Sequence, residues 1–529
     1  MNSHEEKFQR CVALFNDGRF ADAIKIASEL NSEFPSHTGV LLLLLKSYYF
    51  LNDFENSERK LLELIEVEKN NSGYHSMLAL VQKKLGKIDT AVVSYQNAIS
   101  LDPGLAENYY NLGILFFETG EYQKSLENFN KAVMSDEYFY LAHYNAGNVY
   151  RKLKNYVLSA ESYRKAITVK PDFEDAHYNL GVVLEYSQNF NEALISYENT
   201  LKLNPGNIEA KWNRSLLLLL KGNYETGLKE YECRIEKNQL IRKNRAEKRW
   251  NGESLTNKKL LVYSEQGFGD TMQFLRFIPR LKEKGAFVIL ETRPELIDLL
   301  KNKKLPDKII SRDEHTDFIC DYEVPLLSLP FMLRLKQSEM GMHSPYIEPD
   351  LSRHKNLVEK IKSLNGFKTG IVWRGNPAHI RDDERSVDIS LFESLSEIKD
   401  LKLISLQKGI SEPQIIKDLL GKNITRFGNN FDEISAVISQ LDLVISVDTA
   451  VAHLAGAMNK PVWTLIPAYP DWRWGLNGSE TFWYPSMKLY RREAGKTWED
   501  LFKNLSRDLE YLITKSEKIG KQQTLRISN

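Results

Sequence analysis

The chain has 529 residues, too many for one hydrophobic core, so we expect at least two domains. Its 42% hydrophobic and 27% charged residues are typical of a globular protein rather than a disordered one. Lys and Arg total 71, as do Asp and Glu, so the formal charge is zero and no global field attracts nucleic acid or anionic lipid.

The apolar runs at residues 41–45 and 216–220 are far shorter than the ~20 residues that cross a bilayer. The first ten residues are charged and lack the apolar core of a signal peptide. The cysteines Cys11, Cys233 and Cys320 lie far apart in the sequence. We therefore expect a cytoplasmic protein without a transmembrane segment.

The first half carries an internal repeat. The segments YNLG, YNAG and YNLG begin at Tyr110, Tyr144 and Tyr178, which gives the 34-residue period of tetratricopeptide repeats. Small residues recur in the same phase at Ala23, Ala91, Ser125, Ser159 and Ala193. Aromatic residues follow at Tyr95, Phe129, Tyr163, Tyr197 and Tyr231, and prolines occur at Pro35, Pro103, Pro171 and Pro205. Small residues let two helices cross closely, aromatic side chains fill the space between units, and proline ends a helix.

The pattern predicts about seven helix-turn-helix units over residues 4–241. The second and seventh units are the least regular, because Leu45 and Ser215 stand where the central units have glycine. Stacked units of this kind leave a concave groove that holds a peptide. One repeat position is occupied by an amide in four units, at Asn111, Asn145, Asn179 and Asn213. We expect this ladder to bind an acceptor polypeptide; the alternative is that the amides only bond the neighbouring repeat.

The pattern changes after about residue 249. A strand expected at 259–264 leads into EQGFGD and a helix-like stretch, and a second strand is expected at 286–291. Further strands are expected at 369–373, 401–405, 441–446 and 461–466. This order predicts two α/β halves, residues 250–345 and 366–512, with a ligand cleft at the carboxyl ends of their strands. Residues 516–529 are expected to form a polar tail.

The string SVDTAVAHLAGAMNKPVW at 446–463 resembles the donor-site signature of the heptosyltransferase family, and GFGD resembles that family's N-terminal loop. The fold class implied is an α solenoid followed by an α/β GT-B glycosyltransferase with two Rossmann-like halves. Joined to repeats, the chain resembles bacterial protein glycosyltransferases, including those that modify flagellin, and in layout the O-GlcNAc transferases. The resemblance implies inverting transfer from a nucleotide-sugar, with no metal or other cofactor.

The donor phosphates are expected at a helix that opens at Thr449 and Ala450, where free N–H groups and the helix dipole favour anions. The alternative is a plain strand-to-helix turn with Asp448 as its N-cap. His453, in the first turn, is expected to donate to phosphate or sugar as a neutral imidazole. Packing against the sheet is the competing role for this histidine.

A positively charged side chain that stabilises the departing diphosphate is expected in the loop that follows the strand at 369–373. Arg374 and Asn376 are candidates there; Arg381 and Arg385 belong to a run, RDDER, that can also pair with itself. The family's basic residue near this place is matched here by an arginine rather than a lysine. Gln407 and Lys408 end the next strand, where the base and ribose of the nucleotide are expected.

The resemblance places the acceptor base at Asp270, with Glu265 as a reserve. Asp270 and Gln273 also read as an Asp-x-x-Gln capping box, which by itself explains an aspartate there. Gly267 and Gly269 allow a ligand to approach the backbone, or serve only the turn. In the loop at 470–475, Trp472 and Trp474 are candidates to stack on a sugar or base, or to wedge the two halves together.

The function predicted from these features is transfer of a sugar from a nucleotide-sugar to a polypeptide held by the repeats. Two alternatives stay open: a repeat scaffold whose transferase half has decayed, and a transferase for a surface glycan or lipid-linked acceptor. The sequence shows no zinc spacing, Walker loop or nucleophile elbow.

Overall fold

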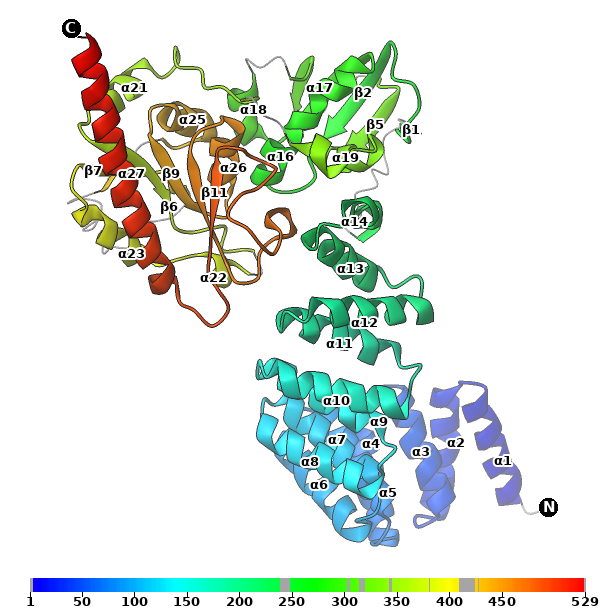
Figure 1. The fold of residues 1–529 in the computed structure, drawn as a ribbon. Helices are drawn as coiled ribbons and strands as arrows, with labels where there is room; N and C mark the ends of the chain where they lie inside the picture. Colours follow the sequence, from blue (N-terminus) through cyan, green and yellow to red (C-terminus); the bar gives the residue numbers. More distant parts are fainter. Residues whose placement is uncertain are drawn as a thin grey trace. The chain divides into compact units, whose positions relative to one another are not determined.

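The computed structural model describes residues 3–237, 248–301, 305–313, 319–341, 345–379, 381–408, 424–426 and 428–527. The chain divides into two compact units, Met1–Asn207 and Ile208–Asn529 (Figure 1). The division falls within the predicted repeat array of residues 4–241, whose last residues, 238–241, lie outside the described part. The seventh helix pair therefore belongs to the same unit as the α/β halves.

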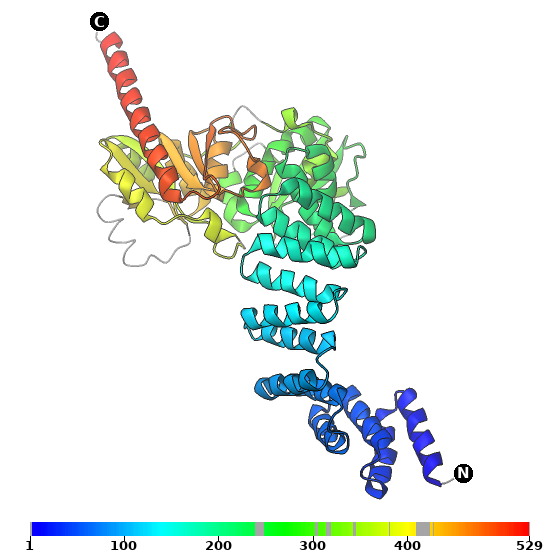
Figure 2. The ribbon, with the colours of Figure 1, turned by 60° about the horizontal axis from the view of Figure 1, so that its bottom comes forward.

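The first unit is a stack of six helix pairs, coloured from blue to cyan in Figure 2. The first three pairs are α1 (Ser3–Asn16) with α2 (Phe20–Glu33), α3 (Thr38–Phe50) with α4 (Phe54–Val67), and α5 (Ser72–Lys84) with α6 (Ile88–Leu101). The next three are α7 (Ala106–Glu118) with α8 (Tyr122–Ser135), α9 (Tyr140–Lys152) with α10 (Tyr156–Val169), and α11 (Glu174–Tyr186) with α12 (Phe190–Leu203). The predicted prolines fall in the connections that follow α2, α6, α10 and α12.

Each central pair is locked by the residue types that define the period. A Cβ added to Gly147 would meet the Tyr163 ring at 2.6 Å, and one added to Gly181 would meet the Tyr197 ring at 2.6 Å. The hydroxyl of Ser159 donates to the Gly147 carbonyl at 2.7 Å, where the two helices cross. Glycine is therefore required because the aromatic ring occupies the space that a side chain would fill.

The second unit begins with the seventh pair, α13 (Ile208–Leu220) and α14 (Tyr224–Tyr231), followed by α15 (Arg234–Lys237). Its first half is a parallel sheet in the order β1-β5-β2-β3-β4. The strands are β1 (Lys248–Arg249), β2 (Lys258–Tyr263), β3 (Ala286–Thr292), β4 (Lys308–Ser311) and β5 (Tyr322–Pro325). The helices are α16 (Phe268–Phe274), η1 (Leu275–Phe277), α17 (Ile278–Glu283), α18 (Pro294–Leu300), η2 (Leu326–Ser328), α19 (Leu329–Met332) and α20 (Gln337–Met340).

The second half is a parallel sheet in the order β11-β10-β9-β6-β7-β8. Its strands are β6 (Phe367–Val372), β7 (Leu401–Ser405), β8 (Ile424–Arg426), β9 (Leu443–Val447), β10 (Val462–Ile466) and β11 (Met487–Arg491). In chain order this is the 3-2-1-4-5-6 arrangement of a doubly wound fold, so its switch point lies between β6 and β9. Both sheets have the parallel, helix-flanked build of the two Rossmann-like halves of a GT-B fold.

The helices of this half are α21 (Lys355–Lys362), α22 (Asp382–Arg385), α23 (Ser390–Glu393), η3 (Ser394–Glu397), α25 (Phe431–Ser439), α26 (Ala450–Ala457), η4 (Trp472–Trp474) and α27 (Trp498–Ile527). One sheet face is covered by α27, which Figure 1 shows lying across the strands, and its Phe502 and Leu505 pack with Phe392 of α23. Helix α27 also includes most of the predicted polar tail at 516–529; the last two residues lie outside the described part.

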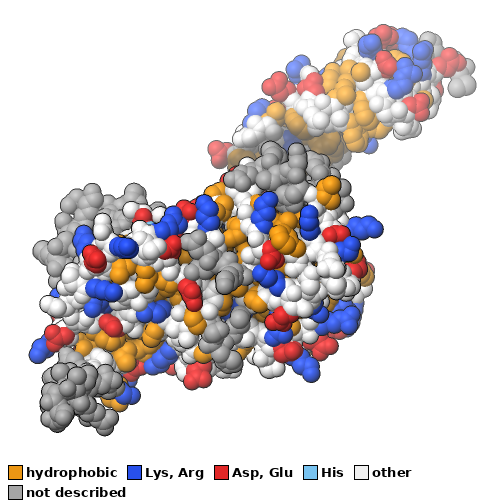
Figure 3. All heavy atoms as spheres, turned by 90° about the horizontal axis from the view of Figure 1, so that it is seen from above, with side chains coloured by type: hydrophobic (Ala, Val, Ile, Leu, Met, Phe, Trp, Pro, Cys, Tyr) orange, Lys and Arg blue, Asp and Glu red, His pale blue; other side chains and the backbone are white. Residues whose placement is uncertain are grey.

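No helix in the described part of the chain is long and apolar enough to cross a membrane. On the face seen in Figure 3, basic and acidic side chains are interspersed, in keeping with the zero formal charge.

Candidate active site

The loops that follow β6 and β9 meet at the switch point of the second sheet. A guanidinium nitrogen of Arg385, in the loop after β6, donates to the Asp448 carbonyl at the end of β9 (3.3 Å). Gly375 lets the first loop fold back on itself, because a Cβ there would meet Asp382 Oδ1 at 2.3 Å. The two segments predicted to bind the donor are therefore neighbours at the edge where doubly wound sheets bind ligands.

Helix α26 begins at Ala450, and its N-cap is Thr449. The alternative interpretation that made Asp448 the N-cap is thus wrong, because the chain is still extended at Thr449. The Thr449 hydroxyl instead lies 3.0 Å from the Ser446 hydroxyl. Burial, followed by repulsion from Asp471, raises the pKa of Asp448 to about 6. The carboxyl next to the start of α26 therefore binds a proton more readily than an ordinary aspartate does.

His453 is enclosed rather than open to solvent. Its Nδ1 lies 3.0 Å from the Tyr484 hydroxyl and its ring stacks on Trp474 at 5.3 Å. Its Nε2 lies 3.9 Å from Asp448 Oδ1. Burial lowers the pKa of His453 to about 3, so the imidazole is neutral near pH 7. The ring packs between the two halves, against Gly269 of the first, rather than only against the sheet. Its contact with phosphate or sugar stays a prediction.

Of the three arginines in the loop after β6, two are already paired. Arg381 contacts Glu384 at 2.6 Å and Arg385 contacts Asp382 at 3.1 Å, so the RDDER run does pair with itself. The Arg374 side chain is exposed and forms no hydrogen bond or ion pair within the part of the chain that the structure describes. Its charge contributes, after hydrogen bonds from Ser390, to a lowered pKa of Asp388. Arg374 is therefore the cation of this loop that is available to a ligand.

Gln407 joins the ends of β6 and β7. Its Oε1 accepts from the N–H groups of Trp373 and Arg374 at 3.2 and 3.0 Å, and its amide nitrogen donates to the Arg374 carbonyl at 3.0 Å. The side chain thus fixes the backbone from which Arg374 projects. Asn376 lies exposed in the same loop, where its Oδ1 accepts from the Ala378 N–H at 3.1 Å.

Lys408 lies among aromatic rings contributed by both halves. Its Nζ is 4.2 Å from the ring centre of Phe431 and 5.5 Å from that of Phe268. Burial lowers the pKa of Lys408. A cation held against two rings is a suitable neighbour for a charged or aromatic ligand group.

The GFGD loop is built differently from the predicted Asp-x-x-Gln box. The N-cap of α16 is Gly267, and Asp270 is the third helical residue, whose Oδ2 accepts from the Gly267 N–H at 2.8 Å. Gln273 does not cap the helix; it is buried and contacts Arg473. The predicted box is wrong because the helix starts three residues earlier than expected, at the N-cap Gly267, which places Asp270 inside the first turn.

Gly269 brings the two halves together. A Cβ on it would meet His453 Cδ2 at 2.6 Å and the Ala450 Cα at 3.4 Å. Helix α16 of the first half therefore packs against the first turn of α26 in the second half. The glycine is needed for this contact, apart from any approach by a ligand.

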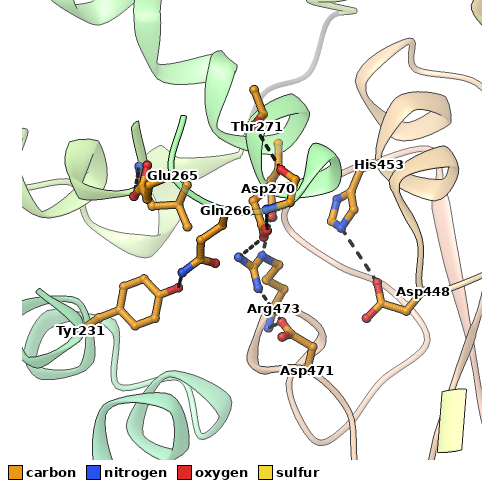
Figure 4. A network of polar contacts seen from close by, with 12 residues as sticks. Tyr231, Glu265, Gln266, Asp270, Thr271, Asp448, His453, Asp471 and Arg473 are labelled. Atoms are coloured by element: carbon orange, nitrogen blue, oxygen red, sulfur yellow. Dashed lines mark hydrogen bonds and ion pairs between the residues drawn. The ribbon is translucent and has the colours of Figure 1, made fainter. Parts of the chain in front are cut away.

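Asp270 forms an ion pair across the halves that sequence reasoning missed. Its Oδ1 lies 2.5 Å from Arg473 Nη2, and Arg473 also contacts Asp471 at 2.9 Å (Figure 4). Burial opposes the charge of Arg473, but Asp270 and Asp471 outweigh it and raise the pKa of the guanidinium. The available signal was an Asp and an Arg placed among the tryptophans of a predicted loop.

Glu265 is not available as a reserve base. Its side chain is 1% exposed and its Oε1 lies 2.9 Å from Arg234 Nη2. The backbone N–H of Leu327 donates to the same oxygen at 3.2 Å. Burial raises the pKa of Glu265, and Arg234 works against that rise. This pair connects α15, after the last repeat, to the first half of the transferase.

Trp472 and Trp474 are buried, but their ring contacts do not join the two halves of the transferase, as one of the two interpretations expected. The Trp472 ring centre lies 6.0 Å from that of Tyr231 and 6.4 Å from that of Tyr224 on α14. Trp474 stacks on His453. Neither ring is free to stack on a substrate in this state.

The asparagine ladder bonds within the repeats. Asn145 Nδ2 donates to the Tyr110 hydroxyl at 3.0 Å, and Asn179 Nδ2 donates to the Tyr144 hydroxyl at 2.8 Å. Asn179 Oδ1 also accepts from Arg151 at 3.0 Å. These bonds favour the alternative interpretation, in which the amides join neighbouring repeats. Asn111 and Asn213 occupy the same repeat position, but Asn213 lies in the second compact unit.

Two other features bear on the site. Within the described residues, no group of three or more His, Cys, Asp or Glu side chains is placed to hold a metal ion. A hollow of about 550 Å3 lined by residues 352–357, Gly428, Asn429 and Glu433 contains none of the predicted site residues. The chemistry that the predicted site offers is therefore a carboxylate, a neutral imidazole, an exposed guanidinium and a helix N-terminus.

The chain is similar to known families in both parts. A glycosyltransferase family 9 (heptosyltransferase) model matches residues 405–479. Tetratricopeptide repeat models match residues 83–120, 106–139, 147–185 and 174–207. Protein FlbA of Caulobacter vibrioides is 25% identical over 278 residues, which are 47% of this chain and 46% of FlbA. The chain thus matches about half the length of this curated relative.

Solved structures that resemble part of this chain include MamA protein and a TPR repeat-containing protein. MamA protein is 24% identical, with a TM-score of 0.30, over 32% of this chain and 92% of that one. The C-terminal part of a TPR repeat-containing protein from Cytophaga hutchinsonii is 18% identical, with a TM-score of 0.38, over 42% of this chain and 93% of that one. The family models and the match to FlbA, rather than these structures, show that the protein carries N-terminal tetratricopeptide repeats and a glycosyltransferase family 9 (heptosyltransferase) domain and is a distant homologue of FlbA.

Proposed function

We propose that the protein transfers a sugar from a nucleotide-sugar to a polypeptide recruited by the repeats, with inversion and without a metal ion. The observation that carries this proposal is that the segment matching the family model supplies second-half residues that contact the first half. The segment that matches glycosyltransferase family 9, residues 405–479, contains Arg473 and His453, which contact Asp270 and Gly269 of the first half, and Asp448, which lies beside His453.

Transfer with inversion needs a base, a site for the diphosphate and a cation. In the proposed reaction, Asp270 removes the proton of the acceptor hydroxyl as its oxygen attacks the anomeric carbon. The bond from that carbon to the diphosphate breaks, and the nucleoside diphosphate leaves with the electron pair. The α26 N-terminus and Arg374 stabilise the charge that develops on it.

The acceptor is proposed to be a polypeptide because the first unit is a repeat array, an architecture that uses its concave surface to bind peptides. This part of the proposal rests on the array and not on Asn145 and Asn179, whose amides are engaged within it. A flagellin-like acceptor and a cytoplasmic location belong to the same proposal.

Thermal unfolding of the full chain with UDP, GDP, ADP, CDP and CMP tests donor binding. One of these nucleotides is expected to stabilise the transferase transition by about 2.7 kcal/mol at a hundred times its Kd, because it binds only the folded state. The corresponding nucleosides, which lack phosphate, serve as controls. An unchanged transition with all five nucleotides would contradict the proposal and favour the decayed scaffold.

Two variants separate the proposed roles. Arg374→Ala is expected to weaken binding of the stabilising nucleotide about tenfold, the loss of one charge-assisted contact. Arg507→Ala, which removes an exposed arginine of α27, is the matched control. Asp270→Ala should keep nucleotide binding and lower turnover about 10²-fold or more. Equal loss of nucleotide binding in the Arg374 and Asp270 variants would mean that the roles are misassigned.

Removal of the first unit tests the acceptor. A chain of residues 208–529 is expected to hydrolyse the nucleotide-sugar as the full chain does, but to lose incorporation of labelled sugar into protein. Equal incorporation by both chains would contradict a role of the repeats in acceptor binding. Label that appears only in the lipid or glycan fraction would favour a surface glycan or lipid-linked acceptor.

A further inference from the structure

Three consecutive side chains of the short helix η4 reach three different parts of the second unit. Trp472 packs on Tyr231 of the last repeat, and Trp474 stacks on His453 of α26. Between them, Arg473 reaches Asp270 of the GFGD loop, 203 residues earlier in the chain. Figure 4 shows Asp270 and Arg473 pointing toward each other, with Asp471 on the other side of the guanidinium.

Every side-chain nitrogen of Arg473 has one fixed acceptor. Nη2 contacts Asp270 at 2.5 Å, Nη1 contacts Asp471 at 2.9 Å and Nε donates to Gln273 at 2.8 Å. The Arg473 carbonyl is held in turn by the indole N–H of Trp483 at 2.9 Å. A planar guanidinium bound on three sides, with its backbone also fixed, has one orientation.

The Asp270 carboxylate is consequently held at both oxygens. Oδ1 is on Arg473, and Oδ2 accepts from the Gly267 N–H at 2.8 Å. The side chain is still 21% exposed, and each oxygen has a second lone pair. The carboxylate can therefore accept one more proton donor from the solvent side, but it cannot turn toward or away from it.

We propose that Arg473 is a positioning residue that fixes the Asp270 carboxylate in the direction of the acceptor hydroxyl. This inference rests on the proposed function, in which Asp270 is the base. Gln273 supports the guanidinium from α16, the same helix that carries Asp270, so the base and its support move together. Trp472 and Trp474, on either side of Arg473, pack on Tyr231 of the last repeat and on His453 of α26, and so help to hold the guanidinium in this orientation.

A kinetic double-mutant cycle on the full chain tests the proposal. The variants are Asp270→Asn, Arg473→Gln and the double variant, with Arg473→Lys as the conservative change and Arg507→Gln as the surface control. Turnover is measured as nucleotide release from UDP-glucose, UDP-N-acetylglucosamine, GDP-mannose, ADP-glucose and CMP-sialic acid. Binding of the nucleotide that stabilises the wild-type chain is measured by calorimetry.

Arg473→Gln is expected to lower kcat about 10²-fold, the loss that follows from a misplaced catalytic group. KM and the nucleotide Kd should stay within about twofold, and Arg473→Lys should restore part of kcat because it keeps the charge. In the Asp270→Asn background, adding Arg473→Gln should cost little more, because the residue acts through a carboxylate that is already gone.

Losses that multiply in the double variant would overturn the positioning role, as would an effect on KM or Kd with kcat unchanged. A Lys variant no better than the Gln variant, with both melting early, would also overturn it and leave Arg473 as a structural ion pair. Full turnover in Asp270→Asn would refute Asp270 as base, and with it this proposal. A wild-type chain that binds none of the nucleotides and releases none would instead refute the proposed function itself.

Discussion

The repeat array and the centre of the transferase are held together in opposite ways. In the array, one contact recurs: the glycine of one helix lies against the aromatic ring sixteen residues later, as in Gly113 with Phe129 and Gly147 with Tyr163. In the centre of the transferase, the contacts that join its parts occur once each and link residues that are distant in the chain, such as Arg473 with Asp270 and Arg234 with Glu265. A recurring contact leaves a period in the sequence, whereas a contact made once leaves none.

The repeat architecture and the transferase fold meet at the helix pair α13 and α14. By sequence period, helices α13 and α14 are a seventh repeat; by contacts, they belong to the transferase unit. Their inward side chains, Tyr224 and Tyr231, meet Trp472 in place of a further repeat. The last repeat thus serves as part of the transferase core.

The largest change in stability is expected when the helices α13–α15 are removed from the transferase. A chain of residues 245–529 should be less stable than one of residues 208–529 by about 3–5 kcal/mol, because Glu265 loses the compensating charge of Arg234 and Trp472 loses its packing partners on α14. Urea unfolding followed by tryptophan fluorescence measures the difference. Glu265→Gln should recover part of the loss in the shorter chain only. Equal stability of the two chains would mean that the last repeat is a dispensable neighbour.

A single methyl group tests the recurring contact. Gly147→Ala should destabilise the array by about 1–3 kcal/mol, because the new Cβ overlaps the Tyr163 ring, which has no room to withdraw. Gly104→Ala is the matched control, since its Cβ would meet only Asp102 Oδ1 at 3.6 Å. The measurement is the unfolding temperature of the repeat array in both variants, compared with that of the wild-type chain. A Gly147 variant as stable as the control would show that the helix crossing is loose.

The smallest expected effect is a pH dependence at the contact between the halves. The pKa of His453 is about 3 in the folded state and near 6.5 when unfolded, so the unfolded chain binds the extra proton and stability falls as pH drops below about 6.5. The loss should reach about 1.4 kcal/mol by pH 5.5. Asp448, with a raised pKa of about 6, works in the opposite direction over the same range.

His453→Asn should therefore make the unfolding midpoint of the transferase less sensitive to acid than that of the wild-type chain. His75→Asn, in the repeat array, is the control and should leave that slope unchanged. Parallel pH curves for the wild-type chain and the His453 variant would show that the imidazole is protonated as readily in the folded state as in the unfolded one.

Sequence reasoning was most successful where one physical requirement recurs or one element is long. The repeat period predicted all seven helix pairs, and apolar runs predicted β2, β3, β6, β7, β9 and β10. The strands β1, β4, β5, β8 and β11 were missed. The first four have two to four residues, which carry too little pattern. The five residues of β11 read MKLYR, with charged residues among the apolar ones.

The candidate site was predictable in part. The loop and helix around Thr449 and Ala450 followed from a strand that leads directly into a helix. The partner of Asp270 did not, since nothing local marks Arg473 as its neighbour. The capping assignments of Asp270 and Asp448 failed for a related reason: the residue at which a helix starts depends on where the chain turns, and one residue of shift changes which side chain caps.

The position of the boundary between Asn207 and Ile208 has a consequence for engineering the protein. The six preceding helix pairs form their own compact unit, and each pair fills one 34-residue period. Whole repeats can therefore be exchanged or inserted before residue 207 in steps of one period. The seventh pair, α13 and α14, should be kept with the transferase. If the repeats bind the acceptor as proposed, chimaeras made at this boundary should modify different acceptor polypeptides and still transfer the same sugar.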